Sequence, residues 1–312
     1  MADDVQAPVR PAADERGLAT WEPADIAGLL LPAWDAFIDL VTDLDLDGPT
    51  RLPDRTAREL CVHVGVWPGS RSLPRLVEEA ARADLVTDDP RGGVFDQASH
   101  DEAVLEAWSA APHAEILSAL ATARADVAAY LRSAEAATLG SRRVRTALGP
   151  LPLTTMVAAV TFDLAVHALD LAPAGAAEPP APLLAAGLAA LTDTTGALAS
   201  RQGITAYAAT VTPGGGWAFS ATPQAWLTVD LAQVPPQWPA VAGETAALLD
   251  ASAGRRAVPA MLATRELRLH HVGGLLALTP LLENVPGLPG GAALRMAART
   301  VRTAGRLLGR RG

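Results

Sequence analysis

Residues 152–172, PLTTMVAAVTFDLAVHALDLA, decide the fold of this chain. The segment is apolar nearly all round, which predicts a buried α-helix. Its ionisable side chains are Asp163, His167 and Asp170, and spacings of four and three residues place them on one stripe of that helix. Buried carboxylates and imidazoles are costly unless they are paired or bind a metal. The stripe therefore predicts either a buried ion pair or one face of a metal site.

The rest of the chain indicates a mainly α-helical protein with two domains. A length of 312 residues suits two domains of ordinary size. The hydrophobic fraction of 50% includes much alanine, and aromatics are only 4%, which favours Ala-rich helices. Prolines cluster over 173–182, and strand-like runs follow, which predicts a linker and then a small α+β domain with an antiparallel sheet.

We therefore expect a disordered lead-in (1–20), a helical domain (21–177), a small α+β domain (178–290) and an Arg-rich tail (291–312). A T-x-x-E capping box at Thr56 and Glu59 predicts the start of the second helix. The first predicted helix runs from about Trp21 or Pro23 through Val41 to the turn LDLDG (44–48), and the second from Thr56 through His63, with Pro68 and Gly69 ending or kinking it. The other predicted helices are about 72–84, 101 or 113 to 136, 152–172, 183–200 and 243–253. The predicted strands are 204–212, 216–221, 225–231 and 266–274.

The charge distribution is asymmetric. The net charge is −9, the chain has no lysine, and the segment 294–312 carries six Arg and no acid. This tail is expected either to be a solvated, frayed helix or to contact an acidic partner or an anionic surface. The acidic remainder would repel phosphate, so we expect no nucleic-acid partner.

The same composition bears on compartment and assembly. The N-terminus lacks the apolar core of a signal peptide, the ionisable stripe argues against a transmembrane segment, and the single Cys61 excludes an intrachain disulfide framework. We expect a cytoplasmic monomer or homodimer.

Three residues are candidate metal ligands. Catalytic zinc is commonly held by three His or carboxylate side chains, with a fourth position open. Asp163 and His167 would supply two, and His63, in the apolar run LCVHVGVW, is the best third. The alternatives stay open: Asp163 and His167 as a buried ion pair, Asp170 as a cap or a partner of an Arg, and His63 as a hydrogen-bonded core residue.

Two segments carry a family resemblance. PTRLPDRTARELCVHVGVW (49–67) resembles the segment of mycothiol-dependent maleylpyruvate isomerase-like proteins in which a helix delivers a metal-binding His. TFDLAVHALDLAPAG (161–175) resembles their second segment, a carboxylate four residues before a His. The half from Ile204 through VAGETAALLDASAGRR to LLENV is similar to their smaller C-terminal domain, so the resemblance covers about Trp21 to Val285.

The resemblance implies a DinB-like four-helix bundle followed by the α+β domain. It implies His63, Asp163 and His167 as ligands of a divalent metal, with zinc the expected ion, and Asp170 as a supporting or structural residue. The family usually has Glu where this chain has Asp163, which is one methylene shorter. The implied thiol is mycothiol or a related low-molecular-weight thiol, because Cys61 lies on another side of its helix from His63.

The resulting hypothesis is a metal-dependent, mycothiol-dependent isomerase or thiol S-transferase that acts on a small electrophilic substrate. Arg255 or Arg256 would bind a carboxylate of substrate or cofactor, unless both only place positive charge at a helix C-terminus. Two alternatives remain: a non-catalytic binding or regulatory protein that keeps the bundle, and a metal-dependent hydrolase. No G-x-S-x-G elbow or P-loop occurs, and PGGGW after a strand-like run is a turn.

Overall fold

A computed structural model describes residues 10–82 and 95–284 of the chain. The chain divides into two compact units, Leu18–Thr194 and Met1–Gly17 together with Thr195–Gly312. The division falls inside the long helix Ala181–Arg201. The expected boundary was the proline cluster that precedes this helix. The Arg-rich tail predicted over 291–312 lies outside the described residues.

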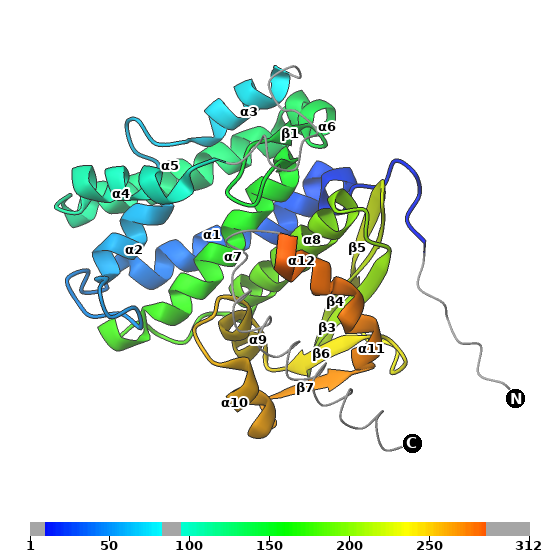
Figure 1. The fold of residues 1–312 in the computed structure, drawn as a ribbon. Helices are drawn as coiled ribbons and strands as arrows, with labels where there is room; N and C mark the ends of the chain where they lie inside the picture. The colour runs from blue at the N-terminus through cyan, green and yellow to red at the C-terminus, as the bar shows by residue number, and fades with distance from the viewer. Residues whose placement is uncertain (1–9, 83–94, 285–312) are drawn as a thin grey trace, which may run out of the picture. The chain divides into compact units, whose positions relative to one another are not determined.

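The first unit, Leu18–Thr194, is built from helices (Figure 1). They are η1 Gly17–Thr20, α1 Pro23–Thr42, α2 Ala57–Val64, α3 Leu73–Ala81, α4 Gln97–Trp108, α5 His113–Arg132, α6 Ala134–Leu139, α7 Leu153–Asp170, η2 Ala172–Ala174 and most of α8 Ala181–Arg201. Two short antiparallel strands, β1 Arg143–Val144 and β2 Leu151–Pro152, precede α7.

Helix α1 packs against α5 and α7, and α2 packs against α4, α5 and α7. The fully buried side chains at these contacts are large and apolar, as the sequence pattern predicts. They include Trp34, Phe37, Ile116, Leu120, Leu153 and Leu164.

Two expectations for this unit differ from the structure. Residues 10–20 are not a disordered lead-in where they are described, because Gly17–Thr20 form η1 and Leu18 is fully buried. The helix expected from 101 or 113 to 136 begins at His113 as α5 but ends at Arg132, and α4 and α6 are separate helices before and after it. Pro112 stands at the N-cap of α5, and Ser133 lies in an extended conformation between α5 and α6, so neither residue continues a helix.

The second unit contains a five-stranded sheet in the order β5-β4-β3-β6-β7. Its strands are β3 Ala206–Thr212, β4 Gly215–Thr222, β5 Ala225–Leu231, β6 Ala240–Gly243 and β7 Leu267–His270, and its helices are α9 Thr245–Ser252, α10 Val258–Ala263, α11 Val272–Leu275, η3 Leu276–Leu278 and α12 Thr279–Asn284. Gly215, at φ 138°, begins β4 in the predicted PGGGW turn.

The sheet is mixed and not purely antiparallel as expected, because β3 and β6 run parallel. Strand β6 was missed because AVAG is short, and its Ala and Gly carry no β-branched signal. The core of this sheet gathers around Trp238, which lies in edge contact with Tyr207, their ring centroids 5.6 Å apart.

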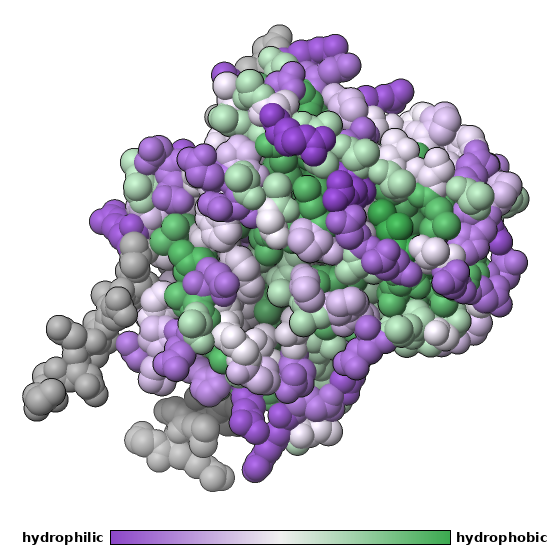
Figure 2. Space-filling view, turned by 180° about the vertical axis from the view of Figure 1, so that it is seen from behind, coloured by the Kyte–Doolittle hydropathy of each residue, from purple (hydrophilic) through white to green (hydrophobic). Residues whose placement is uncertain are grey.

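Helices α7 and α8 are long and apolar enough to cross a membrane, but 67% and 72% of their most apolar windows are buried within the structure. Such burial is typical of core helices. On the face shown in Figure 2, apolar and polar residues lie in interspersed patches. Among the described residues, Leu276 is the large hydrophobic residue that lies exposed, at 36%.

Candidate functional site

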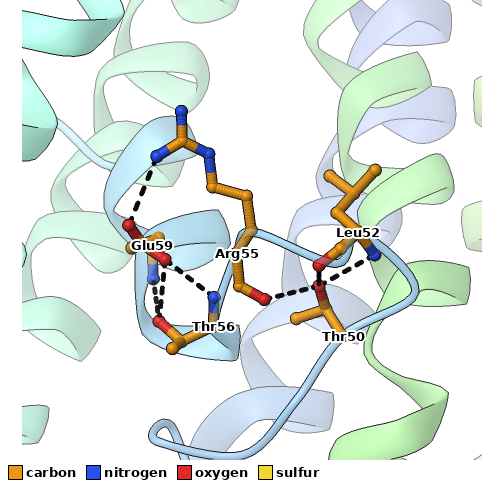
Figure 3. A network of polar contacts seen from close by, with 5 residues as sticks. All are labelled: Thr50, Leu52, Arg55, Thr56 and Glu59. Carbon is orange, nitrogen blue, oxygen red and sulfur yellow. Dashed lines mark hydrogen bonds and ion pairs between the residues drawn. The ribbon is translucent and has the colours of Figure 1, made fainter.

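The capping box predicted from sequence fixes the start of α2 (Figure 3). The Glu59 N–H donates to the Thr56 hydroxyl at 3.3 Å, and the Glu59 carboxylate accepts the Thr56 N–H at 2.7 Å. The N–H groups of Thr56 and Glu59, which have no carbonyl partner within the helix, both receive a side-chain acceptor in this way. The box sets where α2 begins and so which way His63, one residue before its end, faces.

The loop before α2 is joined to the end of α7. The Thr50 hydroxyl donates to the Arg55 carbonyl at 2.8 Å and accepts the Leu52 N–H at 3.1 Å. Between them, the Arg51 N–H donates to the Asp170 carbonyl at 2.9 Å. These contacts tie the N-terminal side of α2 to the stripe of α7 that carries the ionisable residues.

His63 and His167 lie in ring contact. Their ring centroids are 5.4 Å apart and the rings lie nearly perpendicular, at 87°. His167 is 8% exposed, and the side chain of His63 is 26% exposed. Burial lowers the pKa of His63, and His167 lowers it further, while Asp163 and Asp101 oppose this. His63 is therefore neutral at pH 7, the form that binds metals.

Each imidazole faces a carboxylate through Nδ1. His167 Nδ1 lies 3.3 Å from Asp170 Oδ2, and Asp170, fully buried, also lies 3.9 Å from Arg51 Nε. His63 Nδ1 lies 3.5 Å from Asp101 Oδ2. Asp170 was expected either as a supporting residue or as the partner of an Arg, and that Arg is Arg51, whereas Asp101 was not predicted. Asp101 is 38 residues from His63 and Arg51 is far from Asp170, so no local spacing could reveal either pair.

Asp163 is half-buried on α7 and close enough to His63 to affect its pKa. The donor types, two imidazoles and a carboxylate, match those of zinc sites. Within residues 10–82 and 95–284, however, no three His, Cys, Asp or Glu side chains are gathered as a metal-binding group. The structure thus pairs His63 with His167 and leaves the place of Asp163 in a ligand set as a prediction.

Cys61 is fully buried, and burial raises the pKa of its thiol to about 12. A thiol with this pKa is not a nucleophile at neutral pH. Any thiol chemistry at the site therefore needs a thiol from outside the chain, as the sequence reasoning anticipated.

Arg255 and Arg256 lie after α9, in the unit that contains the sheet. Arg256 Nη1 forms an ion pair with Glu266 Oε2 at 2.6 Å, and this hydrogen bond raises the pKa of the guanidinium. The Arg255 N–H donates to the Asp250 carbonyl at 2.9 Å. Arg256 thus has a structural partner, and its anion-binding role stays a prediction.

Residues 28–172 match the model of the mycothiol maleylpyruvate isomerase N-terminal domain. No curated protein sequence matches the chain. Two solved structures are similar: a mycothiol-dependent maleylpyruvate isomerase, at 17% identity, and a mutant of it, at 16%. Each match covers 77% of this chain and 92% of the other, with a TM-score of 0.45.

Proposed function

We propose that this protein is a mycothiol-dependent isomerase or thiol S-transferase, because residues 28–172 match the model of the mycothiol maleylpyruvate isomerase N-terminal domain. Its substrate would be a small electrophile. The observation that carries the proposal is the contact between His63 and His167, which the sequence places 104 positions apart and the fold brings to 5.4 Å. Two partly buried imidazoles in contact, one of them held neutral, are suited to bind a ligand between them.

The proposed ligand is a divalent metal, with zinc the expected ion, held by His63, His167 and Asp163. When bound, such an ion would lower the pKa of a coordinated thiol and keep it as a thiolate. The chain's own contribution is to keep His63 neutral, to hold His167 through Asp170, and to exclude Cys61 from the chemistry by burying it. The thiol would then be mycothiol or a related small thiol.

The helix contacts support a DinB-like four-helix bundle as part of this proposal. α1 packs against α5 and α7, and α2 packs against the same two helices, which closes a ring of four. His63 and His167 lie on two neighbouring members of that ring.

Elemental analysis of protein purified without an affinity tag tests the metal proposal. About one zinc per chain is expected in the wild type and loss of it in His167→Ala. The matched control is His270→Ala, an exposed His at the end of β7, which should keep the metal. Metal-loaded wild type should then bind mycothiol in a calorimetric titration.

A folded wild type that takes up no metal after incubation with zinc would contradict the metal proposal. Metal without thiol affinity would instead favour the alternatives of a metal-dependent hydrolase or a non-catalytic protein with a structural ion.

Arg256 is proposed to bind a carboxylate of the substrate or the thiol. The expected effect of Arg256→Gln is a several-fold increase in KM with little change in kcat, because one charge-assisted hydrogen bond is lost. Glu266→Gln is the control, because it removes the partner in the ion pair but keeps the guanidinium. If both variants lose only thermal stability and KM is unchanged, Arg256 has a structural role alone.

A further inference from the structure

Each of the two imidazoles of the site has a carboxylate close to its Nδ1, and the two carboxylates come from different helices. On α7, His167 Nδ1 meets Asp170 Oδ2 at 3.3 Å. On α2, His63 Nδ1 meets Asp101 Oδ2 at 3.5 Å, and Asp101 comes from α4. In both cases Nε2 is the ring nitrogen that remains for another partner.

Asp101 is itself held in place. The Gln97 side-chain amide donates to Asp101 Oδ1 at 2.6 Å, one turn earlier on α4. One carboxylate oxygen therefore accepts from Gln97 and the other faces His63. A neutral amide at position 101 has a single oxygen, so it could not present an acceptor to Gln97 and to His63 at the same time.

Helix α4 has no buried residue, so core packing does not explain its sequence. It lies against α2. Trp108 stacks on Trp67 near the C-terminal end of α4, with ring centroids 4.9 Å apart, and His100 Nε2 accepts the Arg71 N–H at 3.1 Å. These contacts join α4 to the segment that follows α2, and α4 also packs on α2 itself.

A histidine whose Nδ1–H donates to a carboxylate keeps its proton on Nδ1 and presents an unprotonated Nε2. We propose that Asp101 is a positioning residue that fixes the tautomer and ring orientation of His63, the counterpart of Asp170 for His167. The inference extends the proposed function, because it makes Nε2 of both imidazoles the atoms offered to a metal.

The test compares Asp101→Asn with Glu102→Gln in the full chain. Glu102 is the next residue on α4 and is exposed, so its variant removes the same charge without touching His63. Asp101→Glu is the conservative variant, which keeps the carboxylate. Proton–nitrogen NMR of the histidine rings in metal-free protein, at mildly alkaline pH, reads the tautomer directly.

His63 should carry its proton on Nδ1 in the wild type, in Glu102→Gln and in Asp101→Glu. In Asp101→Asn, the share of His63 with its proton on Nε2 should increase. Zinc affinity, measured by competition with a chromophoric chelator, should fall about 10–100-fold in Asp101→Asn alone. The same tautomer in wild type and Asp101→Asn would overturn the positioning role, as would unchanged zinc affinity in a wild type that binds zinc.

The two proposals fail separately. A wild type that binds no zinc overturns the proposed metal function, and the tautomer in metal-free protein still decides the role of Asp101. If Asp101→Asn does not fold, Gln97→Ala replaces it, because this variant removes the donor that holds Asp101. If His63 in Gln97→Ala keeps the wild-type tautomer and the wild-type chemical shifts of its ring nitrogens, the proposal is overturned.

Discussion

A single residue, Cys61, shows how burial decides chemistry. With its thiol pKa raised to about 12, only about one thiol in ten thousand is ionised at pH 8. We expect Cys61 to react with a disulfide reagent orders of magnitude more slowly in the native protein than in urea, measured by the release of the chromophore. Fast stoichiometric labelling of the native protein would contradict this. Cys61→Ala should leave any mycothiol-dependent turnover intact.

At this scale, the residues that could be predicted from the sequence are those that stand out from their own segment. His63 and His167 were predicted because each is an imidazole in an apolar helical run, and the structure brings the two into contact. Asp101 gave no such signal, since it lies in a polar helix where a carboxylate is ordinary. Its significance depends on α4 packing against α2, which no local pattern records.

At the scale of an element, the N-terminus of α2 offers a stability test. Thr56→Ala removes the hydroxyl that accepts the Glu59 N–H, and the expected loss is about 1 kcal/mol of unfolding free energy, measured by urea denaturation. Ser72→Ala is the matched control, because Ser72 is the N-cap residue of α3 but makes no side-chain capping bond. Equal losses in the two variants would show that the capping box contributes nothing.

The contact between α3 and β1 gives a prediction on pH. Burial alone would raise the pKa of Glu79, but hydrogen bonds from the Arg145 N–H at 2.6 Å and from Arg71 at 2.8 Å outweigh it, and the net pKa is lowered. A lowered folded-state pKa means that the stabilisation is present above the unfolded-state pKa and is lost as the pH falls through the folded-state value.

We therefore expect Glu79→Gln to lower the unfolding free energy at pH 7 by about 1.5–3 kcal/mol, the range for hydrogen bonds to charged groups. Below the unfolded-state value of about 4.5, the difference from wild type should shrink as the pH falls. Urea denaturation at a series of pH values measures this. Glu78→Gln, which removes an exposed carboxylate one residue earlier, should show neither effect.

Elements with caps and strong periodicity were predicted well, and those without them were not. Helices α1, α2 and α7 and strands β3, β4 and β5 lie close to their predicted ranges, because each has a start signal or an apolar pattern. The parallel strand β6 and the break after α5 were missed, and the start of α5 was left open between 101 and 113. Their positions are set by tertiary pairing and by single residues such as Pro112, so propensity alone did not locate them.

At the scale of the whole molecule, one buried carboxylate joins distant parts of the chain within the helical unit. Asp193 on α8 is fully buried and accepts the Leu18 N–H at 2.9 Å and the Thr155 hydroxyl at 2.8 Å. These partners lie 175 and 38 residues away, so no sequence pattern indicated the contact. It explains why residues before α1 are ordered where a disordered lead-in was expected.

Replacing this carboxylate should loosen the two segments that it joins, the one before α1 and the first turn of α7. In Asp193→Asn the single amide oxygen can accept from Leu18 or from Thr155 but not from both, and the amide N–H₂ would face a donor. Leaving a buried donor unsatisfied costs about 1–3 kcal/mol, and the loss of a charge-assisted bond adds to it. Hydrogen exchange should therefore quicken at the Leu18 amide and across the first turn of α7. Thr192→Val, one residue earlier on α8, is the control, because its hydroxyl bonds only within that helix. Unchanged exchange at Leu18 in Asp193→Asn would mean that apolar packing of Leu18 alone orders the segment before α1.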